Sequence, residues 1–388
     1  MPKSVAILYD CPFPFVQGGG QKRLFEIAQI LLAEGWRVEW YALKFWQGPD
    51  TLEYEGILYR AVGRGVELYS SNGKRRIGET FYYGWKILCQ PELRHFDILH
   101  AGQWPFLHLI PARIFSLWGG GKLVVDWWEV WGKDLWINYF GLKGILGLLL
   151  EKCLARITPH IIAITQKGKE QIQLLGVEAS RIKFIPNGID FEKIQNAACK
   201  DKEFDLVYMG RLKNHKNVSH IFQALGILKK KGLLLSLQVI GDGPDRASLE
   251  KLAQDLDITH NIIFHGMIAS DEEAYAQVKA SRLFVYPSTK GSASIMIMEA
   301  NACGLPILAY KCDYGLSPEL VEEGVNGFWV DGLEPQAMAE TLEKIFSNRG
   351  EDINFDSLVI EHAQKYAWKN IGKTYNDYFL SLIKSRQE

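Results

Sequence analysis

The sequence predicts an α/β protein made of two doubly wound domains that face each other across a central cleft. With 388 residues, the chain is too long for one ordinary domain and long enough for two. Continuous apolar runs, which are typical of strands buried on both faces, alternate with amphipathic helical patterns in both halves. Ligands of such folds bind at the carboxyl ends of the strands, so the cleft is the expected site.

The first half alternates strand and helix patterns and is expected to form a domain over residues 1–195. Its second strand, RVEWYAL, follows a helix that Gly35 ends. The strands are expected at 5–10, 37–43, 96–101, 122–126, 160–165 and 182–186, and the helices at 21–35, 105–115, 145–157 and 167–176.

A polar segment at 191–204 interrupts the pattern and suits a linker. The second domain is expected over 200–369. A last helical pattern, at about 370–388, is a candidate to pack back on the first domain, which the spacing leaves open. Strands are expected at 204–210, 235–241, 261–266, 282–288 and 306–310, and helices at 218–232, 245–256, 271–281 and before Cys303.

Composition narrows the function. A net charge of −1 gives no whole-molecule field that would attract nucleic acid. The first ten residues resemble a strand rather than a signal peptide, and no apolar run approaches the length of a membrane span, so we expect a cytoplasmic protein that touches a membrane at most at its inner face. Six cysteines lack metal-ligand spacing and are expected to be buried reduced thiols: Cys11, Cys89, Cys153, Cys199, Cys303 and Cys312.

Two loops after expected strands could hold an anion. In QGGGQ (17–21), Gly19 and Gly20 would let the backbone approach a ligand and direct helix amides at it, although a flexible turn is an equal alternative. In MGRLKNHKN, Arg211 and Lys216 could neutralise a diphosphate without a metal. A solvated basic loop is the alternative there.

The stretch PSTKGSASIMIMEANACGLP combines a small-residue turn with an apolar helix that carries one carboxylate. If the helix begins near Ser294, its free amides suit a phosphate. Glu299 would then lie about 7.5 Å further along the axis and could accept hydrogen bonds from two ribose hydroxyls. The alternative is an ordinary exposed acid after an ordinary loop.

These motifs together resemble the retaining family 4 glycosyltransferases of the GT-B fold, whose two domains are Rossmann-like. The resemblance spans nearly the whole chain and is strongest from 185 to 330. It is carried by Gly210-Arg211-Leu212 with Lys216, Gly241-Asp242-Gly243-Pro244, Pro287-Ser288, Glu299-Ala300, Ala302, Gly304, Pro306, Asn326-Gly327 and Asn187-Gly188-Ile189-Asp190.

The resemblance implies a nucleoside diphosphate sugar as donor substrate, retention of anomeric configuration and no metal or other cofactor. By resemblance, Arg211 and Lys216 hold the diphosphate and stabilise it as it leaves, while Glu299 holds the ribose. The remaining donor contacts that it implies are Gly19, Gly20, Gly210, Met267, Ser292, Ser294, Ile295 and Met296.

Two positions depart from the family pattern. Gly291 stands where the family has a glutamate eight residues before the ribose carboxylate, which leaves the donor sugar open. Trp128 stands where the family often has a histidine after the strand that ends at Asp126. Asp126, Glu129 or His100 could supply a polar contact on the acceptor side instead.

Aromatic residues are concentrated in the first half, where ten of the twelve tryptophans precede residue 137. Tryptophan stacks on sugars and also favours membrane interfaces, although core packing is the commoner role. The segment 133–152 mixes lysines with bulky apolar residues. It could lie on a membrane to reach a lipid-linked acceptor, or it could be a buried amphipathic helix.

We therefore expect a hexosyltransferase that uses a nucleoside diphosphate sugar, with uridine favoured by resemblance alone. The acceptor would be a saccharide or lipid-linked saccharide in surface or exopolysaccharide synthesis. Alternatives are a nucleotide-sugar epimerase or hydrolase of the same architecture, or a catalytically weakened nucleotide-sugar-binding protein. A dehydrogenase fits poorly because QGGGQ lacks the G-x-G-x-x-G spacing.

Overall fold

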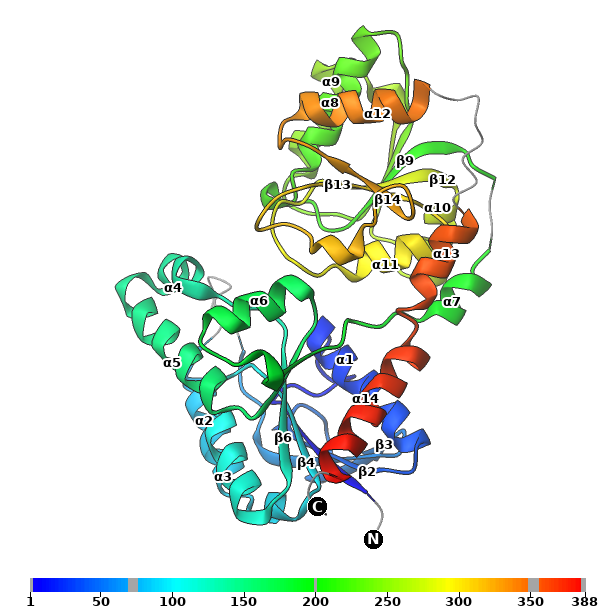
Figure 1. Cartoon of the computed structure of the whole chain (residues 1–388). Helices are drawn as coiled ribbons and strands as arrows, with labels where there is room; N and C mark the ends of the chain where they lie inside the picture. Colours follow the sequence, from blue (N-terminus) through cyan, green and yellow to red (C-terminus); the bar gives the residue numbers. More distant parts are fainter. Residues whose placement is uncertain (1–2, 69–75, 199–200, 348–355, 385–388) are drawn as a thin grey trace. The chain divides into compact units, whose positions relative to one another are not determined.

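The computed structural model describes residues 3–68, 76–198, 201–347 and 356–384 (Figure 1). The chain divides into two compact units. The first unit combines Met1–Asn187 with Trp368–Glu388, and the second unit is Gly188–Ala367. Both are α/β with a sheet that is parallel or nearly so, as the sequence predicts.

The first unit contains an eight-stranded sheet in the order β3-β4-β2-β1-β5-β6-β7-β8. All neighbours pair in parallel except β3, which is antiparallel to β4. The strand order reverses between β1 and β5, where Ile7 pairs with His100. The strands are β1 (Ser4–Leu8), β2 (Arg37–Lys44), β3 (Thr51–Tyr54), β4 (Ile57–Arg64), β5 (Ile98–Gly102), β6 (Lys122–Trp127), β7 (His160–Ala163) and β8 (Ile182–Phe184).

Helices cover both faces of this sheet, which explains why β1 and most of β2 consist of buried residues. Helices α1 (Gly19–Ala33) and α14 (Trp368–Lys384) pack side by side on one face. The other face carries α2 (Ile77–Leu88), α3 (Leu109–Gly119), α4 (Gly132–Phe140), α5 (Gly144–Ile157) and α6 (Gln166–Leu174). Short 3-10 turns are η1 (Pro91–His95), η2 (Gly141–Lys143) and η3 (Ala179–Arg181).

The second unit contains a fully parallel six-stranded sheet in the order β11-β10-β9-β12-β13-β14. Numbered within the unit, this is the 3-2-1-4-5-6 order of doubly wound nucleotide-binding folds, and its switch point lies between β9 and β12. The strands are β9 (Phe204–Met209), β10 (Leu237–Ile240), β11 (Ile262–Gly266), β12 (Ser281–Tyr286), β13 (Ile307–Tyr310) and β14 (Gly327–Val330).

Two groups of helices sandwich this second sheet. One core contains side chains of α8 (Val218–Lys230), α9 (Arg246–Asp255) and α12 (Pro335–Ser347). The other contains side chains of α7 (Phe191–Asn196), α10 (Asp271–Lys279), α11 (Ile295–Ala302) and α13 (Asp356–Gln364). The 3-10 turns are η4 (Asn214–Lys216), η5 (Thr259–Asn261) and η6 (Pro318–Leu320).

The structure differs from the sequence-based expectations in three places: a domain boundary, a hairpin and the start of a helix. The first unit ends at Asn187 rather than 195, because α7 forms within the expected linker and packs on α11 of the second unit. The β3–β4 hairpin extends the first sheet and was not expected. The helix expected from residue 105 begins at Leu109, because Phe106 adopts a φ of 70° that no right-handed helix accommodates.

The expectation that the cysteines are buried is partly wrong. The thiols of Cys11 and Cys303 are buried and that of Cys312 is half-buried, but Cys89 and Cys153 are exposed. Cys199 lies outside the described residues. Within the described ranges, no helix combines the length and apolar character that crossing a membrane requires.

Candidate active site

The switch point of the second sheet brings two predicted loops together. Strand β9 leads into Gly210 and Arg211, and its neighbour β12 leads into the 287–294 loop that precedes α11. Loops that follow adjacent strands on the two sides of a switch point frame the crevice in which such sheets bind ligands. The second unit therefore places the basic loop and the start of α11 at one edge of its sheet.

The basic loop is anchored beside the end of β12. The Lys216 ammonium lies 5.8 Å from the centre of the Tyr286 ring, and burial lowers the pKa of Lys216 below its usual value. Asn217 donates to the Pro287 carbonyl at 3.2 Å and to the Thr289 hydroxyl at 3.2 Å. A lysine that has lost part of its hydration favours an anionic partner.

Several positive charges gather at this edge of the sheet. The pKa of His215 is lowered by burial and then by the charges of Lys216, Lys213 and Lys290. Because Lys290 belongs to the loop after β12 and the other two belong to the loop after β9, cations from both loops act on the same imidazole. Arg211 is exposed, and its carbonyl accepts a hydrogen bond from Tyr208. This field suits a ligand with two or more negative charges.

Helix α11 begins at the predicted position. Ser294 is the N-cap residue, is buried and makes no capping hydrogen bond through its side chain, which instead interacts with Tyr286. The Ile297 amide already donates to the Ser294 carbonyl at 3.3 Å, and the amides of Ile295 and Met296 precede it at the helix start, where backbone amides suit an anionic ligand. A Cβ atom added at Gly210 would lie 3.5 Å from the Met296 methyl carbon, so the start of α11 adjoins the end of β9.

Glu299 lies on the second turn of α11 and is half-buried. Its Oε1 accepts a hydrogen bond of 2.9 Å from the Tyr275 hydroxyl of α10. Burial, followed by the charge of Glu299, raises the pKa of Tyr275, so this hydroxyl stays a donor at neutral pH. Tyr275 thus fixes the orientation of the carboxylate, and sequence reasoning missed it because nothing in DEEAYAQVKAS distinguishes it from a core tyrosine.

Gly291 adopts a φ of 97°, in the region that L-residues rarely occupy, and its amide donates to the Tyr314 carbonyl at 3.0 Å. A Cβ atom there would meet nothing within 4 Å. Backbone conformation, and not lack of space, therefore opposes a glutamate at this position. Of the other predicted donor contacts, Ser292 is half-buried in the same loop and Met267 is exposed directly after β11.

The G-D-G-P motif has a structural explanation. A Cβ atom at Gly241 would lie 2.1 Å from the Gly210 carbonyl oxygen, and one at Gly243 would lie 2.1 Å from that of Leu212. The loop after β10 thus packs backbone to backbone against the loop that carries Arg211. These glycines shape the basic loop and need no ligand contact to account for them.

In the first unit, the predicted glycine loop leads into α1. A Cβ atom at Gly19 would meet nothing within 4 Å, whereas one at Gly20 would lie 2.6 Å from the ring of Trp128. The same ring lies 2.7 Å from the Cβ position of Gly102 and packs edge-on against Tyr9. Trp128, in the loop after β6, therefore packs against the start of α1, the end of β5 and Tyr9 after β1, and this packing accounts for Gly20.

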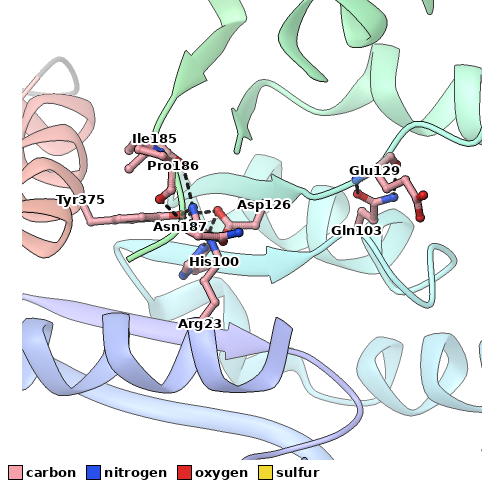
Figure 2. A network of polar contacts seen from close by, with 9 residues as sticks. All are labelled: Arg23, His100, Gln103, Asp126, Glu129, Ile185, Pro186, Asn187 and Tyr375. Atoms are coloured by element: carbon pink, nitrogen blue, oxygen red, sulfur yellow. Dashed lines mark hydrogen bonds and ion pairs between the residues drawn. The ribbon is translucent and has the colours of Figure 1, made fainter. Parts of the chain in front are cut away.

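A buried polar network surrounds Arg23 of α1, the helix that this loop precedes (Figure 2). Arg23 of α1 is 2% exposed, and its Nε lies 2.9 Å from Asp126 Oδ2. Its other nitrogens donate to the Ile185 and Pro186 carbonyls, the Asn187 side chain and the Tyr375 hydroxyl of α14. The network ties α1, β6, the last residues of the unit's first segment and α14 together.

Asp126 and His100 belong to this network and are both fully buried. Tyr375 donates to both carboxylate oxygens of Asp126, and His100 Nε2 lies 3.3 Å from Oδ1. Burial alone would raise the pKa of Asp126, but the Arg23 charge and the His100 and Tyr375 contacts outweigh it and hold this pKa below its usual value. As they stand, both residues serve structure, and reaching an acceptor would require this network to open.

Glu129 is the exposed member of the predicted acceptor-side group. Buried Gln103 holds its backbone from both sides, donating to the Glu129 carbonyl at 2.6 Å and accepting from its amide at 3.1 Å (Figure 2). The Trp131 indole donates to its carboxylate at 3.2 Å. Partial desolvation raises the pKa of Glu129, against the effect of that hydrogen bond. Sequence reasoning missed Gln103, which positions this acid.

A third cluster in the first unit consists of Asp10, Cys11 and Glu79, all buried. Their potential ligand atoms lie within 4.8 Å of one another. None of them was a predicted site residue. The cluster lies in the first unit, whereas the predicted diphosphate contacts Arg211 and Lys216 lie in the second.

Two Rossmann-like sheets, the second fully parallel and the first parallel except for β3, define a two-domain protein of the GT-B class. The second sheet carries cations and a helix N-terminus at its switch point. Residues 17–193 match the model of the Glycosyltransferase Family 4 family, and residues 190–365 match that of the Glycosyl transferases group 1 family. The chain belongs to the group 1, family 4 glycosyltransferases and is an enzyme that transfers sugar.

Individual relatives agree with this assignment. An uncharacterized glycosyltransferase of Methanocaldococcus jannaschii is 26% identical over 98% of each chain. The alpha-monoglucosyldiacylglycerol synthase of Streptococcus pneumoniae is 28% identical over 51% of this chain and 47% of its own. Among solved structures, Anabaena HepE in complex with UDP superposes with a TM-score of 0.73 at 18% identity, covering 98% of this chain and all of HepE.

Proposed function

We propose that this glycosyltransferase moves a hexose from a UDP-sugar, with retention of configuration, to a saccharide or lipid-linked saccharide acceptor in surface polysaccharide synthesis. The observation that carries the proposal is the meeting of cations from two loops with the start of α11 at the β9–β12 switch point. The UDP bound to HepE, a protein of the same fold, supports uridine as the base.

In this proposal, Arg211, Lys216 and the amides of Ile295 and Met296 bind the diphosphate, and Glu299, held by Tyr275, binds the ribose. Transfer breaks the bond between the anomeric carbon and the diphosphate oxygen and forms a bond to the acceptor hydroxyl oxygen, whose proton is released. Negative charge grows on the departing phosphate, and fixed cations stabilise it there. Because these cations neutralise the departing phosphate, we propose that cleavage of the donor needs no metal ion.

Isothermal titration calorimetry with UDP, GDP and ADP tests the donor site. Arg211→Ala and Glu299→Ala should each weaken UDP binding about tenfold or more, because each removes a charge-assisted interaction. Arg282→Ala is a matched control, since Arg282 is exposed near the amino end of β12, opposite the site. Unchanged UDP affinity in both site variants would refute the assignment of the donor site. Tighter binding of GDP or ADP than of UDP would show that the donor base is guanine or adenine and not uracil.

Transfer itself is tested with labelled UDP-sugars and a panel of acceptors, and the anomeric configuration of the product is read by NMR. Gly291 stands where the family has a glutamate, and its φ of 97° disfavours a glutamate there. Loss of that contact with the donor sugar would weaken transfer, so a nucleotide-sugar-binding protein with weakened activity is the second candidate. UDP binding without any transfer would support that candidate. Sugar release or epimerisation without an acceptor would identify a hydrolase or epimerase.

A lipid-linked acceptor requires the enzyme to work at a membrane surface, and we propose the inner face of the cytoplasmic membrane as its place of action. The segment 133–152 proposed for that contact folds as α4, η2 and α5 rather than as one helix. Trp136 is buried, whereas Leu142, Leu146 and Leu149 are exposed. Part of this segment is core, and part faces solvent.

A further inference from the structure

Three helices of the first unit expose large apolar side chains in regular stripes. On α2 these side chains recur at intervals of three to four residues, which places them on one helical face. The α3 and α5 helices show the same spacing. The exposed residues are Ile77, Phe81, Trp85 and Leu88 on α2, Ile110, Ile114, Leu117 and Trp118 on α3, and Ile145, Leu146, Leu149 and Ile157 on α5.

The three helices form one continuous surface. Helix α3 contacts both α2 and α5, and the inner sides of all three contribute to the same buried core against the sheet. Figure 1 shows them along one side of the first unit. Their outer stripes are therefore apolar surface beyond what the core uses, and contiguous apolar patches of this kind mark interaction sites.

The charges on this surface are of one sign. The three helices contain two carboxylates, Glu79 and Glu151, and both are buried. Glu151 accepts from the Trp136 indole at 2.8 Å and from two backbone amides. The remaining charged residues of these helices are Lys86, Arg113, Lys152 and Arg156, which are exposed or half-buried.

A groove of about 570 Å³ lies between α3 and α5, with apolar side chains beside three guanidinium groups. Its lining includes Ile110, Ile114, Leu117, Arg113, Arg156 and Arg181. The pKa of neighbouring His160 is lowered to about 4 by burial and then by the charges of Lys122, Arg181 and Arg113. The groove thus combines an apolar wall with a positive field.

We propose that the α2–α3–α5 face docks on a lipid bilayer that carries anionic head groups. The apolar stripes enter the boundary between head groups and acyl chains, and the four cations of the helices, together with Arg181 of the groove, meet lipid phosphates. Pairing of this face with a second copy would bring the same cations against each other without a carboxylate to neutralise them. The inference rests on the proposed membrane location and adds to it the surface and the lipid.

Flotation of the full chain with vesicles tests the proposal without donor or acceptor. The vesicles contain phosphatidylcholine alone or phosphatidylcholine with phosphatidylglycerol. We expect binding to the anionic vesicles that weakens as salt is raised, because salt screens the attraction to the lipid phosphates. Equal binding to both kinds of vesicle, or binding to neither, overturns the proposal.

Two variants address the two halves of the argument. Phe81→Ser, Leu117→Ser and Leu149→Ser together remove one apolar side chain from each helix and should weaken binding at least a hundredfold. Lys86→Gln with Lys152→Gln should weaken it about 25-fold, from about fivefold for each charge near an anionic surface.

Exposed residues elsewhere provide the matched controls. Leu174→Ser, Leu234→Ser and Leu358→Ser remove three exposed leucines outside the face, and Lys230→Gln with Lys251→Gln removes two lysines from the second unit. Controls that lose vesicle binding as strongly as the variants overturn the proposal.

Thermal melting and UDP calorimetry establish that each variant is folded. Failure of the wild type to bind UDP would refute the donor site while leaving the vesicle result in force, so the two proposals fail separately. Multi-angle light scattering adds a further outcome. A dimer that the apolar variant abolishes, with no vesicle binding by the wild type, replaces the membrane with a second copy of the chain.

Discussion

Removing Arg23 should destabilise the first unit severely. Arg23 and Asp126 are 2% and 0% exposed, and Arg23 donates to five separate acceptors. Substitution Arg23→Met keeps much of the side-chain volume but leaves the Asp126 carboxylate buried without its counter-charge. Breaking a buried pair on one side costs about 3–5 kcal/mol. For a unit of this size, that lowers the melting temperature by roughly 6–20 °C.

Urea unfolding followed by tryptophan fluorescence measures this loss. Ten tryptophans precede residue 137, and Trp368 also belongs to the first unit, so the signal reports almost entirely on that unit. With an m-value of about 2–3 kcal/mol/M, the midpoint should fall by roughly 1–2.5 M. Arg76→Met is the control, because the ion pair of Arg76 with Glu67 is exposed and is worth at most about 1 kcal/mol.

The double variant Arg23→Met with Asp126→Asn separates the charge from the packing. It should regain part of the lost stability, since the uncompensated carboxylate is gone. A loss below about 1 kcal/mol in Arg23→Met, or a double variant less stable than the single one, would refute the view that the buried charge dominates.

Three further outcomes follow from the site and its surroundings. Tyr275→Phe should weaken UDP binding about fivefold by freeing Glu299, and unchanged affinity in calorimetry would contradict that positioning role. Gly241→Ala should cost about 1–3 kcal/mol in calorimetric unfolding, because its Cβ would lie 2.1 Å from the Gly210 oxygen; a neutral effect would show that the loop relaxes freely. The folded-state pKa of Asp126 lies below its ordinary value of about 3.9, so its ion pair stabilises the protein above that pH and loses this effect as pH falls toward the folded-state pKa. Asp126→Asn should flatten the acid limb of stability against pH, and an unaltered slope would contradict the assignment.

Much of the architecture could be predicted because parallel strands buried on both faces leave a plain mark in the sequence. The run VAIL of β1 and the run LFVY of β12 are examples. The predicted Arg211 lies in the loop after such a strand, and Glu299 lies on α11, the helix that follows the loop after β12. The β3–β4 hairpin could not be predicted in this way, because neither strand is a continuous buried run. The edge strand β3 alternates exposed with half-buried residues, and β4 mixes buried with half-buried residues.

The contacts that position the site residues could not be predicted from the sequence, for a different reason. Arg23 and Tyr375 hydrogen-bond across 352 positions of sequence, and Tyr275 reaches Glu299 from a neighbouring helix. No local pattern links such partners, because they meet only after the sheet has assembled. For the same reason, Asp126 and His100 could be placed at strand ends from the sequence, but their burial in an ion-pair network could not.

Helix α14 belongs to the first unit but follows the second unit in the sequence, and this order has a consequence for synthesis on the ribosome. The first unit also needs Trp368–Glu388, so it can be completed only after the whole second unit, Gly188–Ala367, has been synthesised. Until Tyr375 emerges, Arg23 and Asp126 lack the hydroxyl that both contact, and the surface that α14 covers stays open. A premature stop codon after Ala367 would leave a whole second unit attached to an incomplete first one.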